Sequence, residues 1–137
     1  MTFITSRRPG FTLLELLVVI SIIGILMTLG VAAFSTAQKK GRDAKRQGDI
    51  KSIQNAFEQY YADNSGYGTC DAMTTADYFS SGTRPVDPKT GVNYTCTSTG
   101  TTYCVCATLD DTTGGNATDA SCTFGAGAGY FCLKNLQ

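Results

Sequence analysis

The sequence predicts an α+β fold in which one long N-terminal helix, transmembrane in its first half, carries a small antiparallel β-sheet head stabilised by disulfides. Three observations support this. Residues 11–34 form an apolar run with Glu15 as the only charge, and a helical pattern continues beyond that run to about residue 63. All six cysteines lie in the turn-rich remainder. A helix of about 50 residues would be roughly 75 Å long.

The apolar run is long enough to cross a bilayer, since about 20 such residues suffice. A secretory signal peptide would have its cleavage site after the apolar core, and no clean Ala-x-Ala-like site follows near Ala33. An unpaired acid within a span is unfavourable and usually marks a partner or a pathway. We therefore expect Glu15 to have a cationic partner.

The sequence RRPGFTLLE at residues 7–15 resembles the class III leader of bacterial type IV prepilins and secretion pseudopilins. The resemblance implies that a prepilin peptidase cleaves between Gly10 and Phe11 and that Phe11 becomes the N-methylated first residue. Glu15 would be the signature acid of the family, and the head would be a pilin-like α/β roll. Many relatives have a proline where this chain has Ala32, so the helix melting that proline favours is not implied here.

Cleavage at Gly10 would create a cationic partner for Glu15. The new α-amino group of Phe11 titrates near pH 8 and is mostly protonated at neutral pH. This amine could pair with Glu15 within one helix, about one turn away, or between adjacent subunits, which would set the register of assembly. The alternative is a signal anchor whose Glu15 is hydrated at the cytoplasmic interface.

Four regions follow from these patterns: a leader at 1–10, a transmembrane and filament-core helix at 11–34, an amphipathic helix at 35–63 and an extracytoplasmic β-rich head at 64–137. The second region of helix has apolar residues at helical spacing, which predicts a face packed on the head. These residues are Ile50, Ile53, Phe57, Tyr60 and Tyr61.

In the head, residues 92–97 and 102–109 flank a turn at 98–101 and predict a hairpin, and residues 129–133 predict a third strand. Residues 49–68, and the turn at 85–91 with Tyr94, resemble the helix end and the Asp-Pro-x-Gly turn of major pseudopilins.

The cysteines predict up to three disulfides and place the head in an oxidising compartment outside the cytoplasm, with the N-terminus inside. Cys104 and Cys106 share one face of a strand, so each is expected to bond to a different neighbouring element. The sequence leaves the connectivity open. A zinc or redox site is disfavoured because the chain has no His and no Cys-x-x-Cys pair. The six are Cys70, Cys96, Cys104, Cys106, Cys122 and Cys132.

Basic residues follow the apolar run, and a positive-inside count alone would favour the opposite orientation. With the head outside, they are expected to face outer headgroups or acidic residues of neighbouring subunits. Nucleic-acid binding is disfavoured, because the cluster is short and lacks interleaved aromatics. The cluster comprises Lys39, Lys40, Arg42, Lys45 and Arg46.

One loop offers a candidate metal site. Asp110, Asp111, Asn116 and Asp119 surround a Gly-Gly pair, and oxygen ligands of this kind suit calcium. The loop loosely resembles the calcium loop of major pseudopilins, although its spacing is not that of an EF-hand. A solvated polar loop is the alternative.

No catalytic motif appears, so we expect no enzyme but a substrate of the peptidase and methylase. The expected function is a structural subunit of a type IV pilus or pilus-like filament. It would be a single-pass protein of the cytoplasmic membrane that polymerises with identical copies through the assembly machinery. One alternative is a pseudopilin of a type II-like secretion system, with a periplasmic filament. Another is a membrane-tethered adhesin or receptor that does not polymerise.

Overall fold

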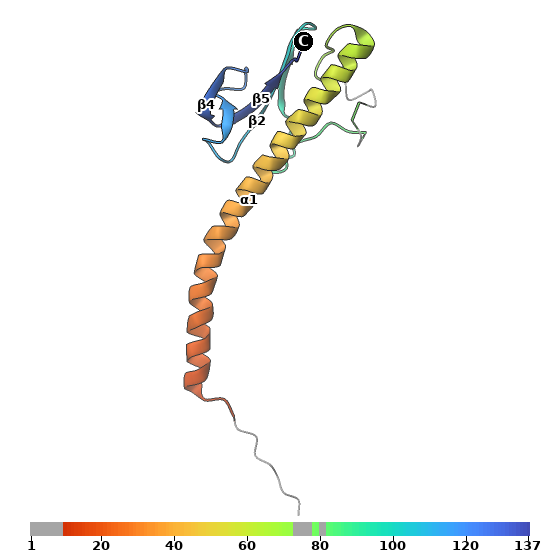
Figure 1. Ribbon diagram of the computed structural model, residues 1–137. Helices are drawn as coiled ribbons and strands as arrows, with labels where there is room; N and C mark the ends of the chain where they lie inside the picture. Colours follow the sequence, from red (N-terminus) through yellow and green to blue (C-terminus); the bar gives the residue numbers. More distant parts are fainter. Residues whose placement is uncertain (1–9, 73–77, 80–81) are drawn as a thin grey trace, which may run out of the picture. The chain divides into compact units, whose positions relative to one another are not determined.

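The computed structural model describes residues 10–72, 78–79 and 82–137, and it confirms an α+β fold (Figure 1). One α-helix, α1, runs over Leu13–Asn64 and is 52 residues long, close to the expected length. The leader residues 1–9 lie outside the described residues. The strands are β1 Thr95–Ser98, β2 Tyr103–Thr108, β3 Gly115–Ala117, β4 Phe124–Ala128 and β5 Tyr130–Lys134.

The chain divides into two compact units after Ala37. In the first unit, the large apolar side chains of α1 are exposed, from 45% at Val18 to 81% at Leu13. This part of α1 is long and apolar enough to cross a membrane. An apolar surface of this extent is stable in lipid or against other apolar helices, and it is unfavourable in water.

In the second unit, the C-terminal part of α1 packs on the sheet (Figure 1). Ile50, Ile53 and Phe57 are fully buried, which confirms the predicted face. The ring of Phe57 stacks on Tyr103 of β2 with centroids 4.0 Å apart. Tyr60 and Tyr61 are partly buried at the edge of the same core.

The sheet is antiparallel, with strand order β1-β2-β5-β3-β4. The predicted hairpin is β1 and β2, joined around Gly100, and the predicted third strand is β5. The sequence analysis missed β3 and β4. β3 has three residues and β4 alternates glycine with alanine, so neither carries the β-branched or aromatic pattern that predicts a strand.

Candidate functional site

The expected cleavage bond lies just before α1. Gly10 and Phe11 are exposed and precede the first helical residue, Leu13. A Cβ placed on Gly10 would meet nothing within 4 Å. The bond is therefore outside the helix and sterically open, as a peptidase substrate must be.

Glu15 forms a reciprocal capping pair with Thr12. The amide N–H and the hydroxyl of Thr12 both donate to Glu15 Oε2 at 2.9 Å, and the amide of Glu15 donates to Thr12 Oγ1 at 3.2 Å. Such a capping box satisfies amides that the first helical turn leaves unpaired. The sequence analysis missed this role, although the Thr-x-x-Glu spacing at residues 12–15 signals it.

The structure does not describe a cationic partner for Glu15, so that prediction stays open. Both capping residues lie after the Gly10–Phe11 bond, and cleavage there would leave the capping pair on the mature chain. Glu15 thus has hydrogen-bond partners within its own helix before any second subunit is present.

A second cluster of charged side chains lies in the head around Arg46, whose side chain is 3% exposed. Its Nη1 donates to Asp43 Oδ1 at 2.7 Å, and its Nε donates to Asp87 Oδ2 at 2.6 Å. Nη1 also lies 3.4 Å from Asp110 Oδ2. Arg46 therefore joins α1 to the turn at 85–91 and to the segment after β2.

Asp43 holds the start of the β2–β3 loop. Its two carboxylate oxygens accept the backbone N–H groups of Asp110 at 2.8 Å and Asp111 at 2.9 Å. Because the same carboxylate also accepts from Arg46, one residue of α1 orients both a guanidinium and two loop amides.

These contacts shift the pKa values of the acids. The hydrogen bond from Arg46 is the main cause that holds the pKa of Asp87 far below its usual range, despite some burial. The hydrogen bond from Arg42 is the main cause that lowers the pKa of Asp110 to about 2. Burial alone would lower the pKa of Arg46, but hydrogen bonds to Asp87 and Asp43 outweigh it and raise that pKa.

The expected role of the basic cluster is corrected in part. Arg42 and Arg46 both pair with acids of the same chain, which the sequence did not predict. Lys45 pairs with Asp49 one turn along α1 at 3.4 Å. Lys39 and Lys40 stay exposed, as expected. Arg42, Lys45 and Arg46 thus each have an acidic partner within the chain.

The structure does not bring the four candidate calcium ligands together. Asp110 is paired with Arg42, Arg46 and Lys89. Asp111 accepts from Thr113, and Asp119 accepts from the amide of Ser121.

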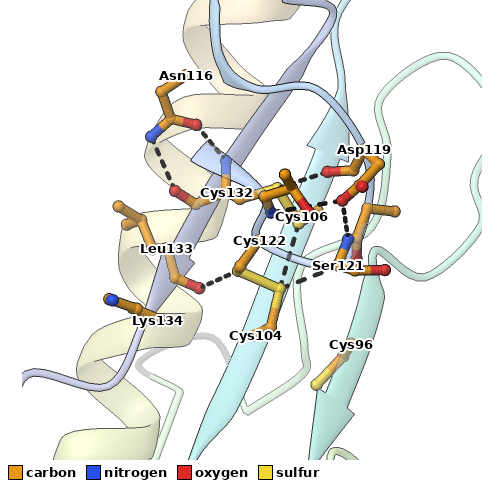
Figure 2. The surroundings of a disulfide bond; sticks show 12 residues. Cys96, Cys104, Cys106, Asn116, Asp119, Ser121, Cys122, Cys132, Leu133 and Lys134 are labelled. Atoms are coloured by element: carbon orange, nitrogen blue, oxygen red, sulfur yellow. Dashed lines mark hydrogen bonds between the residues drawn. A yellow bond between two sulfur atoms is a disulfide. The ribbon is translucent and has the colours of Figure 1, made fainter. Parts of the chain in front are cut away.

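The side chain of the fourth residue, Asn116, is bonded to the backbone of β5 (Figure 2). Its Nδ2 donates to the carbonyl oxygen of Cys132, and its Oδ1 accepts from the N–H of Cys132. Among the described residues, the acids form no group of three or more close enough to share an ion. The three acids of the predicted set, Asp110, Asp111 and Asp119, therefore do not gather around one ion in this arrangement.

The six cysteines form three disulfides: Cys70–Cys96, Cys104–Cys122 and Cys106–Cys132. Cys104 and Cys106 lie on one face of β2 and bond to different elements, as predicted (Figure 2). Their sulfur atoms are 3.5 Å apart, so two bridges pack together behind β2. The predicted disulfide stabilisation of the head is confirmed.

Comparison with known proteins bears on the helix start. A family model described as the prokaryotic N-terminal methylation motif matches residues 5–31, which include Gly10, Phe11 and Glu15. Curated relatives extend the similarity beyond that motif. The start of α1 therefore carries the N-terminal methylation motif that the sequence predicted.

The curated relatives, each similar to only part of this chain, are named type II secretion system core protein G. The protein of Escherichia coli (strain K12) is 42% identical over 65 residues, 47% of this chain and 45% of the relative. That of Aeromonas hydrophila is 43% identical over 63 residues, 46% and 44% of the two chains. That of Vibrio cholerae serotype O1 is 36% identical over 83 residues, 61% and 54%.

The chain thus spans about half the length of the curated relatives it matches. No solved structure matches it.

Proposed function

We propose that this chain is a structural subunit of a pseudopilus-like filament of a type II-like secretion system, and not an enzyme. The observation that carries the proposal is an open Gly10–Phe11 bond directly before a capped, exposed apolar helix. The relatives named for type II secretion support the secretion assignment over the type IV pilus that the sequence analysis placed first.

The proposed mechanism has two steps. The precursor is held in the cytoplasmic membrane by the apolar part of α1, with its N-terminus inside and its head outside. A prepilin peptidase then cuts after Gly10, and the exposed apolar face of α1 leaves lipid to pack against α1 of identical subunits. Burial of apolar surface between helices offsets the loss of lipid contact, while the amine of Phe11 pairs with Glu15 of a neighbour.

The orientation is supported by the disulfides. All three lie in the second unit, and disulfides persist in oxidising compartments outside the cytoplasm. The peptidase site, at the other end of the apolar run, then lies on the cytoplasmic side.

The test of processing is intact-mass spectrometry of the full chain from cells with and without an active prepilin peptidase. We expect loss of residues 1–10 and one added methyl group only with the enzyme. Gly10→Ala, a matched substitution at the same bond, should keep the leader. An intact leader in wild-type chain beside active enzyme would contradict the proposal.

The test of assembly is Glu15→Ala, compared with Glu15→Gln, in cells that make the machinery. We expect both processed chains to accumulate as membrane monomers, with filaments reduced by at least an order of magnitude, because both lose the charge that pairs with the Phe11 amine. Normal filaments in both variants would favour the membrane-tethered adhesin or receptor.

Deletion of the chain separates the two filament functions. Loss of secreted proteins with intact surface fibres supports the secretion assignment. Loss of long surface fibres with normal secretion supports a type IV pilus.

A further inference from the structure

Three carboxylates from three separate segments converge on one guanidinium in the head. Asp43 lies on α1, Asp87 lies in the turn at 85–91, and Asp110 follows β2. All three are sheltered, with side chains 9%, 14% and 12% exposed respectively. The side chain of Arg46 contacts every one of them, whereas the side-chain charges of Arg42 and Lys89 pair with Asp110 alone.

Three sheltered carboxylates that all contact one guanidinium would lose their common positive partner without it, and a sheltered charge without a partner is unfavourable. Arg42 and Lys89 lie at the rim, with side chains 28% and 59% exposed. Arg46 is the cation at the centre, and its planar fork of donors suits several carboxylates at once.

Carboxylates brought from distant segments to one positive centre are also the arrangement in which proteins hold calcium. Here the positive centre is part of the chain. Arg46 holds both the turn at 85–91 and the β2–β3 loop to α1. Asp43 also accepts hydrogen bonds from the backbone N–H groups of Asp110 and Asp111 in that loop.

We propose that the Arg46 guanidinium is a built-in cation that takes the place of a divalent metal ion, so that the turn and the loop stay fixed to α1 without calcium. Of the predicted calcium ligands, Asp110 is already neutralised by Arg46, Arg42 and Lys89 and is therefore not free to bind an ion. This proposal does not depend on the filament function.

The first experiment measures the thermal unfolding of the head in the full chain, purified in detergent micelles, by near-ultraviolet circular dichroism. Wild-type chain should melt at the same temperature in excess EGTA and in millimolar calcium. Arg46→Ala should melt about 10 °C or more lower in EGTA, because it leaves the three carboxylates without their common partner.

Calcium should raise the melting temperature of Arg46→Ala, because the three carboxylates then lack their common cation and can close on an added one. Lys45→Ala is the matched control: it removes one cation from the adjacent position of α1, where the side chain is 59% exposed. It should melt within a few degrees of wild type and should not respond to calcium.

The second experiment uses terbium as the probe and needs no unfolding transition. The chain has no Trp, and Tyr94 lines the cavity of about 310 Å³ shared with Asp87 and Asp110. Tyrosine-sensitised terbium emission should therefore appear in Arg46→Ala and be lost in Arg46→Ala with Asp87→Asn. It should be at least tenfold weaker in wild type.

Three results would overturn the proposal: a wild-type head that loses stability in EGTA, an Arg46→Ala head with wild-type stability, or an Arg46→Ala head that responds to neither calcium nor terbium. If Arg46→Ala fails to fold, the proposal is tested by the melting temperature of wild-type chain in EGTA and in calcium and by its terbium emission. Wild-type chain that binds terbium through Asp87, as shown by loss of emission in Asp87→Asn, contradicts a cluster whose cation is already in place.

Discussion

Arg46 and Asp87 lie 41 residues apart in the sequence, yet Nε of the guanidinium is 2.6 Å from Oδ2 of the carboxylate. The other oxygen of Asp87 accepts the amides of Lys89 and Thr90 at 2.8 Å. The carboxylate thus shapes its own turn and docks that turn on α1. A single pair joins the helix that would build the filament core to a loop of the head.

The first prediction concerns the stability of the head at low pH. The pKa of Asp87 lies far below its usual range and that of Asp110 is about 2, whereas an unfolded Asp titrates near 3.9. Both carboxylates therefore contribute stability that is fully present above about pH 5 and is lost as pH falls toward 2. As the pH falls, these carboxylates are protonated in the unfolded chain before they are protonated in the folded chain, which favours unfolding.

Thermal unfolding across this range should show a falling melting temperature with a shallower slope in Asp110→Asn. That variant should lose about 1–3 kcal/mol at neutral pH, where the paired charge is missing. An unchanged slope in Asp110→Asn would contradict the assigned pairing.

The second prediction concerns Glu58. Its carboxylate accepts the phenol of Tyr103 at 2.9 Å, the phenol of Tyr67 at 3.0 Å and the amide of Leu136 at 3.0 Å. Glu58→Gln should cost about 1–3 kcal/mol, because a single carbonyl oxygen replaces two charged acceptor oxygens. Tyr103→Phe removes only one donor and should cost less, and chemical denaturation of both variants checks the order.

Burial, together with the Glu58 hydrogen bond, raises the pKa of Tyr103 well above 10. The head therefore keeps this stability below about pH 10 and loses it as pH rises further, when only the unfolded chain releases the phenol proton. Tyrosinate absorbance during an alkaline titration should show Tyr103 ionising together with unfolding. Ionisation of Tyr103 in a folded head would contradict the contact.

The third prediction compares two disulfides that close loops of equal length. Cys70–Cys96 and Cys106–Cys132 each span 26 positions, so the loop-closure contribution is the same for both. Cys106 and Cys132 are buried at 2% and 0% exposure, whereas Cys70 and Cys96 are partly exposed.

Replacing either pair by alanine should cost about 2–5 kcal/mol, and the buried pair should cost more, because a cavity adds to the lost cross-link. Denaturant unfolding of the two double variants tests the order. An equal or larger loss in Cys70→Ala with Cys96→Ala would show that burial behind β2 contributes nothing.

The fourth prediction concerns Gly115 on β3, where the pairing with β4 changes register. A Cβ at this position would clash with the backbone carbonyl oxygens of Tyr130 and Ala128. Gly115→Ala must therefore push two strands apart and should cost about 1–3 kcal/mol or more.

Gly129→Ala is the matched control, since its Cβ would make an ordinary contact at 3.6 Å with Thr112. Hydrogen exchange of the β4 and β5 amides should increase in Gly115→Ala and change little in Gly129→Ala. Equal protection in the two variants would contradict the close approach of the strands at β3.

Elements with a strong local pattern were predictable from the sequence. The period of Ile50, Ile53 and Phe57 specifies a helix and the face that it buries, and the aromatic and β-branched residues of β2 favour a strand. The spacing of Cys104 and Cys106 predicts two separate partners because side chains two apart on a strand share a face.

What the sequence left open depends on contacts between distant segments. From the sequence, Arg46 is expected to be one of several surface cations that follow the apolar run. Its partners Asp87 and Asp110 are distant in the sequence, so no local pattern predicts that they surround it. The acids grouped around Gly114 and Gly115 predicted a calcium site. Their spacing does not reveal that Asp110 and Asp111 already have partners within the chain.

The disulfides also limit how far the head can stretch under load. One disulfide joins Cys70 to Cys96 and another joins Cys106 to Cys132. The shortest covalent path from Cys70 to Cys132 therefore crosses both bridges and only the ten peptide units between Cys96 and Cys106. That segment extends to about 35 Å, whereas the unbridged stretch from Cys70 to Cys132 would reach about 220 Å. A subunit pulled between its helix and its C-terminus would therefore behave as a short tether, and a pulling force could not unravel most of the head without first reducing sulfur–sulfur bonds.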